Sequence, residues 1–149
     1  MNGGILMSKY TDLAMERRRL IGPDGRPVYN CAQAVVSVFA RDAGYNEDAA
    51  LKAATYFRGG MQIGSVCGAV TGALMALGFA GLEDAAVSNA LIRKVKAANE
   101  DRINCKELLA ASAARGEVKK EHCDAMIRAC VAWTEEALRE KGKLPKIVE

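Results

Sequence analysis

Residues 59–82 read GGMQIGSVCGAVTGALMALGFAGL, a stretch with seven glycines, one cysteine (Cys67) and no charged side chain. A membrane-spanning helix needs about twenty predominantly apolar residues, so the length alone would allow a span. The first three glycines would, however, break a helix in its first half, because glycine is a poor helix former. Only residues 66–82 could then be continuous helix, which is short for a span and ordinary for a buried helix. The stretch therefore predicts no membrane insertion, but a glycine-rich lead into a central buried helix.

Small residues recur along this helix at intervals of four. Gly68, Gly72 and Ala76 form one ridge, and Ala69 and Ala73 form another. Small side chains let a second backbone approach closely, either inside a bundle or between two chains. We therefore expect this Gly/Ala-rich helix at the centre of the fold, and an exposed face of it would also suit a homodimer.

The composition is that of a single helical domain. The chain has 149 residues, of which 50% are hydrophobic, 26% charged and only 5% aromatic. A domain of this length can bury a substantial core, and a low aromatic content disfavours strands. We predict an all-α fold, a compact single-domain bundle of about five to six helices over residues 1–149, with residues 1–8 and 142–149 as flexible tails.

Turn residues and apolar spacing predict six helical segments. Their ends are marked by N-cap residues such as Asn30 and by glycines such as Gly44. The fifth segment could be broken around residues 99–104. The six segments cover residues 10–20, 30–44, 46–57, 66–79, 84–114 and 119–141.

Charge and targeting signals exclude several function classes. The net charge is only +3, and acidic residues interrupt or flank the basic ones, so we expect no nucleic-acid partner. The opening residues MNGGILMSKY contain no apolar run long enough for a secretory signal peptide. The sequence therefore predicts a cytoplasmic protein.

Five cysteines are many for a chain in a reducing compartment. There, cysteines more often bind metal, take part in redox chemistry or lie buried than form structural disulfides. No C-x-x-C or C-x-x-C-H sequence occurs, so the spacing indicates neither a thioredoxin-type dithiol, nor a zinc ribbon, nor covalent haem attachment. Any site shared by several cysteines must therefore be assembled by tertiary packing.

Three of the cysteines are expected where helices begin. Cys31 and Cys105 each follow an asparagine, and Cys67 ends the glycine-rich lead. A thiol in the first turn of a helix meets the positive end of the helix dipole and free backbone amides, which lower its pKa. Thiolate is the form that ligates a metal or attacks a disulfide, so these three positions are candidates for chemistry.

The remaining two cysteines have different surroundings. Cys130 lies in the apolar stripe of the last helix and is interpreted as a small buried hydrophobe. Cys123 has His122, the single histidine of the chain, beside it. Consecutive helical residues point roughly 100° apart, so the pair need not converge on one metal. His122 is more typical of a surface residue than of a ligand.

Five blocks of the sequence together resemble a known family. They are NCAQAV (30–35), GGM (59–61), CGAVTGAL (67–74), NCKEL (104–108) and Cys123. In this order they are similar to a family of small bacterial and archaeal redox-active proteins named for a C…GCAxxG…C…C signature. The resemblance extends over about residues 13–138.

The resemblance implies a compact helical domain in which four family cysteines gather. It assigns these to Cys31, Cys67, Cys105 and Cys123 and leaves Cys130 outside the site. It further implies redox activity, an iron–sulfur or other metal site, genes close to those of transporters, and kinship with a domain of some multi-haem cytochromes. We also expect Gly68, next to Cys67 in the signature, to belong to the cofactor-binding set.

Three functions remain open at this point. The first is electron transfer by a metal cofactor held by the four family cysteines, an iron–sulfur cluster or alternatively zinc, since soft thiolate ligands suit both. The second is a metal-free thiol–disulfide redox protein in which Cys67 is the catalytic nucleophile. The third is a helical interaction module whose cysteines are only core and which acts with a transporter component or a redox partner.

Overall fold

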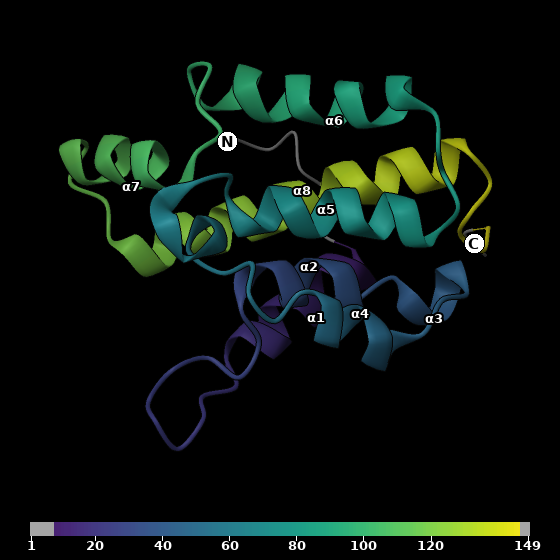
Figure 1. Cartoon of the computed structure of the whole chain (residues 1–149), viewed down its shortest axis with the longest axis horizontal. Coiled ribbons are helices and arrows are strands. Elements are labelled where there is room, and N and C mark those ends of the chain that lie inside the picture. The colour runs from purple at the N-terminus through teal and green to yellow at the C-terminus, as the bar shows by residue number, and fades with distance from the viewer. Residues whose placement is uncertain (1–7, 147–149) are drawn as a thin grey trace.

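The uncharged stretch ends in helix α5 (Gly68–Phe79), which lies beside α8 (Lys119–Glu140) at the centre of the fold (Figure 1). The computed structural model describes residues 8–146, so most of the two expected tails, residues 1–7 and 147–149, lies outside the described part. Over the described residues, no helix is both long and apolar enough to cross a membrane.

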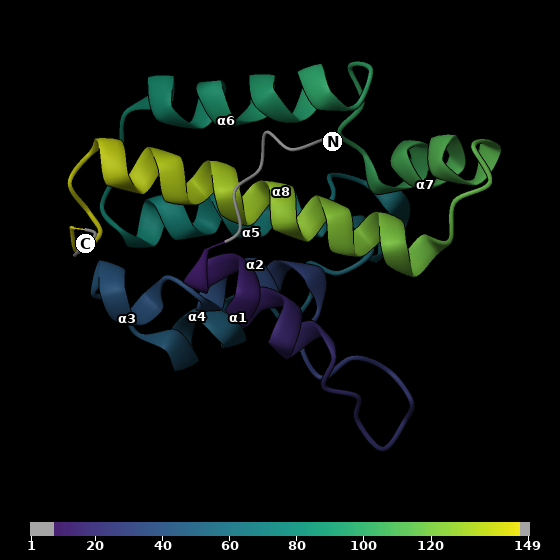
Figure 2. The ribbon, with the colours of Figure 1, turned by 180° about the vertical axis from the view of Figure 1, so that it is seen from behind.

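The other helices cover this central pair from two sides. Helix α6 runs along one side, and the four N-terminal helices pack on the other, as the front and rear views both show (Figures 1 and 2). Helix α7 lies at the end of the bundle where α8 begins. The bounds are α1 (Lys9–Arg18), α2 (Cys31–Ser37), α3 (Ala40–Ala43), α4 (Glu47–Ala53), α6 (Ala85–Ala98) and α7 (Cys105–Ala114).

The predicted all-α class is confirmed, but the predicted number of helices was too low. In the described part the chain forms eight α-helices and one π-type turn, η1 (Gly60–Gly64), with no strand beyond isolated bridges. Residues 30–44 form two helices, because the chain turns at residues 38–39. The Tyr45 hydroxyl donates to the Val36 carbonyl (2.5 Å), an acceptor that a continuous helix would have used for its own backbone. Residues 84–114 divide in the region expected, 99–104, where Glu100 and Asp101 are left-handed.

The small-residue ridge of α5 is used inside one chain. A Cβ atom added at Gly72 would lie 2.5 Å from the Ala32 carbonyl oxygen, so the α2 backbone packs directly on α5. All five ridge residues named above are wholly buried alanines or glycines that lie against α2. The ridge that suggested a homodimer is therefore occupied by α2, and the oligomeric state stays a prediction.

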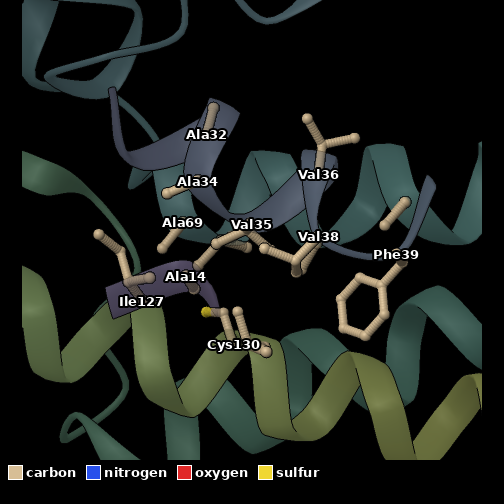
Figure 3. Close-up of a cluster of buried hydrophobic side chains, with 14 of the residues drawn as sticks. Ala14, Ala32, Ala34, Val35, Val36, Val38, Phe39, Ala69, Ile127 and Cys130 are labelled. Atoms are coloured by element: carbon tan, nitrogen blue, oxygen red, sulfur yellow. The ribbon is translucent and has the colours of Figure 1, made fainter. Parts of the chain in front are cut away.

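A continuous apolar core joins α1, α2, α5 and α8 (Figure 3). Val35 and Phe39 come from the α2 side, and Ile127 and Cys130 come from α8. All four are fully buried. Cys130 thus packs as a small hydrophobic residue, as its position in the apolar stripe predicted.

Both ends of the described chain are tied to α8. Ser8 caps α1, and its hydroxyl donates to the Glu135 carboxylate (2.7 Å). After α8, the Lys143 amide donates to the Leu138 carbonyl (2.8 Å), and Leu144 is buried. The described parts of the expected tails therefore pack on the bundle.

Candidate functional site

Four of the five cysteines line one cavity of about 790 Å³. Cys31 is the first residue of α2, Cys67 is the N-cap of α5, Cys105 is the first residue of α7, and Cys123 lies in the second turn of α8. The helix starts predicted for the first three are thus present. The starts of these helices lie toward one side of the bundle in both views (Figures 1 and 2), and the cavity lies there.

A short backbone bridge holds Cys67 next to Cys105. Val66 pairs with Asn104 in an isolated antiparallel bridge. The Cys67 amide donates to the Ile103 carbonyl (3.0 Å), and the Cys105 amide donates to the Ser65 carbonyl (2.6 Å). Two cysteines far apart in the sequence are therefore held at the two ends of one short bridge by main-chain hydrogen bonds.

Cys31 is positioned by the N-cap residue Asn30, which precedes it, and by Gly68 of α5, which packs against it. The Asn30 side chain accepts from the Gln33 amide (2.8 Å) and donates to the carbonyls of Ala54 and Thr55 (3.0 and 3.1 Å). A Cβ atom at Gly68 would overlap the Cys31 sulfur. Gly68 lines the cavity and makes room for a thiol, which is how it contributes to the site.

Burial raises the pKa of three of the four cavity thiols, those of Cys67, Cys105 and Cys123. The pKa of Cys67 is raised to about 12, mainly by burial and to a smaller extent by the neighbouring Cys31 and Cys105. Burial is also the main cause of the raised pKa of Cys105 and of Cys123, with Cys31 adding to both. The expectation that helix starts lower these pKa values is therefore wrong for Cys67 and Cys105. The amides of Ala69 and Val70 do lower the pKa of Cys67, but by less than burial raises it.

One wall of the cavity is a left-handed turn. Gly59, Gly60, Met61 and Gln62 all have φ between 58° and 64°, and Gly59 and Gln62 line the cavity. Left-handed backbone costs roughly 1–2 kcal/mol for a residue other than glycine, so Met61 and Gln62 carry strain. Gly60 could carry no side chain, because a Cβ atom there would overlap the backbone of Ser65. The sequence predicted only a glycine-rich lead into the next helix.

His122 lines the cavity, whereas Cys130 does not. Cys130 does not line the cavity and is fully buried in the core. His122 does line it, and burial lowers its pKa, so its imidazole is neutral at pH 7. Its placement at the cavity was not expected from the sequence.

Sequence reasoning also missed the cations around the cavity. Lys119 lowers the pKa of both Cys105 and Cys123, against the effect of burial, and Arg18 lowers that of Cys123. Arg18 in turn donates to the Tyr29 carbonyl (3.0 Å) and lies 3.5 Å from Asp124. The only available signal was Lys119 and Lys120 at a helix start, where the dipole disfavours cations. The cations that line the cavity are Arg18, Arg26, Arg58, Lys119 and Lys120.

The four thiols share a cavity without converging on a single point. Within residues 8–146, no three His, Cys, Asp or Glu side chains come close enough together to hold one metal ion. The arrangement can present four sulfur ligands to a larger group, or two thiols to each other. It is wide for a mononuclear site such as zinc, which needs tetrahedral ligands about 2.3 Å from the metal.

Most of the chain, including the four cavity cysteines, matches a known protein family. Comparison with curated proteins and with solved structures gives no match. Residues 29–137 match the family described as "Putative redox-active protein (C_GCAxxG_C_C)", and these residues contain all four cavity cysteines. Because the match covers well over half of the chain, this protein belongs to the C_GCAxxG_C_C family.

Proposed function

We propose that the cavity holds an iron–sulfur cluster ligated by Cys31, Cys67, Cys105 and Cys123, and that the protein transfers electrons. One observation carries the proposal: four thiols from four separate helices line a single cavity. Buried structural cysteines would have no reason to gather there. Cys130, which has a purely structural role, lies outside the cavity.

The donor set fits a cluster better than a single ion. Iron–sulfur clusters are held by Cys thiolates, and each thiolate binds a different iron of a [4Fe–4S] cube. The ligands of such a cluster therefore stand farther apart than those around one ion. Four thiols that line one cavity but do not converge on one point suit such a ligand set better than a single ion. When bound, the cluster would supply one-electron redox chemistry.

The protonation of the thiols argues against the metal-free alternative with Cys67 as nucleophile. With a pKa raised to about 12, Cys67 is almost entirely protonated at pH 7, and the thiol form is a poor nucleophile. Metal binding removes this obstacle, because a coordinating thiol is deprotonated outright. The same burial that disfavours thiol–disulfide exchange keeps water away from a bound cluster.

The chain also provides groups that would tune a cluster. The backbone amides of Ala69 and Val70 lower the pKa of Cys67, and amide groups close to cysteine sulfurs tune the reduction potential of iron–sulfur sites. The Cys67 and Cys105 backbones are fixed by the bridge between residues 65–67 and 103–105, which keeps two of the ligands in place.

The test is anaerobic purification followed by a visible spectrum and by iron and sulfide analysis per chain. We expect visible absorption with stoichiometric iron and acid-labile sulfide. Alanine substitution of each cavity cysteine should remove or greatly reduce both. Cys130→Ala is the matched control, since it removes the same group from a folded position outside the cavity and should leave iron and sulfide unchanged.

A colourless, metal-free protein after reconstitution with iron and sulfide would contradict the proposal. Equal loss of iron in Cys130→Ala and in Cys67→Ala would also contradict it, because the loss would then reflect unfolding and not ligation. Far-ultraviolet circular dichroism of each variant separates the two causes.

A further inference from the structure

The charged side chains that line the cysteine cavity all have the same sign. Five cationic side chains line it, and no Asp or Glu does so within the described chain. The whole protein carries a net charge of only +3, with 18 acidic residues, so this imbalance is local. Clefts lined by charges of one sign concentrate ligands of the opposite sign.

Two of the five cations are neutralised by the same carboxylate. Asp124, which does not line the cavity, lies 3.5 Å from Arg18 and 2.9 Å from Lys120. The other three, Arg26, Arg58 and Lys119, have no carboxylate within 4.0 Å among the residues that the structure describes. They are therefore available to an anion from outside the chain. We call Arg26, Arg58 and Lys119 the basic rim.

The basic rim is assembled from three distant parts of the chain. Arg26 belongs to the loop between α1 and α2, Arg58 precedes the left-handed turn, and Lys119 is the first residue of α8. All three side chains are solvent-exposed and also line the cavity. The first turn of a helix is the position where a cation is least favourable, because the dipole is positive there. Helix stability therefore does not explain Lys119 or its neighbour Lys120.

The shape of the site indicates the size of the anion. A volume of about 790 Å³ falls in the range of small-molecule pockets. Apolar groups such as Leu108, Leu109 and Met126 line it along with the cations and thiols, which is the usual mixture in a small-molecule site. A flat acidic protein surface would not fill such a cavity.

We propose that the cysteine cavity binds a small organic anion, which carries carboxylates or another oxyanion group, and that Arg26, Arg58 and Lys119 recognise it. Arginine pairs with carboxylates and other oxyanions through two parallel hydrogen bonds, and lysine adds a point charge. A neutral or cationic molecule of the same size lacks this charge pairing and should bind more weakly. The inference concerns recognition and does not depend on a bound cluster.

A matched pair of thiol reagents tests the proposal in the reduced, metal-free, full-length chain. Iodoacetate and iodoacetamide alkylate the same thiolates and have nearly the same size, but only iodoacetate is an anion. The ratio of their rates therefore cancels the fraction of thiolate and reports the charge around the thiols. We expect this ratio to be several-fold higher for the folded chain than for the same chain in urea.

Substitution of each basic-rim residue by glutamine shows which side chains raise the ratio of the two alkylation rates. Arg26→Gln, Arg58→Gln and Lys119→Gln should each lower the ratio by about twofold, which corresponds to one unit charge about 8 Å away in water. Lys141→Gln is the matched control, because Lys141 is an exposed lysine just beyond the other end of α8 and should leave the ratio unchanged. The effect should weaken at high salt.

Protection experiments distinguish a small anion from an acidic macromolecule. Citrate at millimolar concentration should slow alkylation by iodoacetamide at least twofold, and less so in the rim variants. A folded-state ratio equal to that in urea overturns the proposal. Protection by polyglutamate but not by citrate also overturns it, in favour of an acidic protein partner. Neither result bears on whether the chain loads iron, so the anion site and the cluster can fail separately.

Discussion

The Cys31 sulfur occupies the space that a side chain at position 68 would need. A Cβ atom built on Gly68 would overlap this sulfur and would lie 2.6 Å from the Phe57 carbonyl oxygen. The glycine of the signature sequence is thus explained by close packing between α2 and α5. It allows a cysteine from one helix to lie against the start of another.

Gly68→Ala should damage both stability and the site. The new methyl group must displace the sulfur and the Phe57 backbone, and such overpacking costs typically about 1–3 kcal/mol in the free energy of unfolding. We expect a loss of that size in urea unfolding, together with a lower iron content. Gly78→Ala is the matched control in the same helix, because no atom lies within 4 Å of its Cβ position. It should leave stability unchanged or raise it by up to about 1 kcal/mol.

A double-mutant cycle identifies the atom responsible. In a Cys31→Ala background the sulfur is absent, so the penalty for Gly68→Ala should shrink. It should not vanish, because the Phe57 carbonyl remains close. An undiminished penalty would show that Cys31 is not the group that excludes a side chain at position 68.

Asn30 should stabilise the start of α2, where Cys31 lies, by two separable contributions. Its carboxamide oxygen caps α2, and its nitrogen ties α2 to the end of α4 through the Ala54 and Thr55 carbonyls. Asn30→Ala removes both and should cost about 2 kcal/mol. Asn30→Ser keeps a capping oxygen but loses the bonds to α4, so it should cost about half as much. Equal losses in urea unfolding would mean that the cap contributes nothing.

The raised pKa of Cys67 should make the metal-free protein less stable at alkaline pH. An unfolded thiol loses its proton near pH 9, whereas folded Cys67 keeps its proton until about pH 12. Between these values the unfolded chain binds fewer protons than the folded chain, so the free energy of unfolding falls as pH rises. The slope is up to about 1.4 kcal/mol per pH unit for each such thiol. Urea unfolding at pH 8.5 and 10.5 should show a shallower fall for Cys67→Ala, and identical slopes would contradict the prediction.

Local sequence signals predicted the helices, but two irregular segments between them depend on contacts that have no clear sequence signature. Caps such as Asn30 lie next to the helices that they start, so they can be recognised without the fold. The break after α2 involves a hydrogen bond from Tyr45, and the left-handed turn is closed by the Gly64 amide on the Gly59 carbonyl. Neither contact leaves a clear pattern in the neighbouring residues.

In the site, some features follow from local sequence signals and others arise only when distant parts of the chain come together. The cysteines could be chosen because three of them mark helix starts and because their order resembles a known signature. The basic rim could not, since its members at positions 26, 58 and 119 become neighbours only when the chain folds. The pKa values of Cys67 and Cys105 were predicted in the wrong direction for the same reason. The helix dipole is a local effect, whereas burial is set by the whole fold.

The left-handed turn should be a measurable source of strain beside the cavity. Met61 has φ of 61° and is half-exposed, so its side chain contributes little packing that would offset the backbone cost. Met61→Gly removes a penalty of roughly 1–2 kcal/mol and adds chain entropy to the unfolded state, which offsets part of the gain. We expect a net stabilisation of up to about 1 kcal/mol in urea unfolding. Ile63→Gly is the matched control, since Ile63 is an exposed residue of the same turn without a positive φ, and it should lose about 0.5–1 kcal/mol. Destabilisation by both substitutions would show that the turn carries no strain at Met61. Stabilisation by Met61→Gly together with a lower iron content would instead show that the strained turn helps to shape the cysteine cavity.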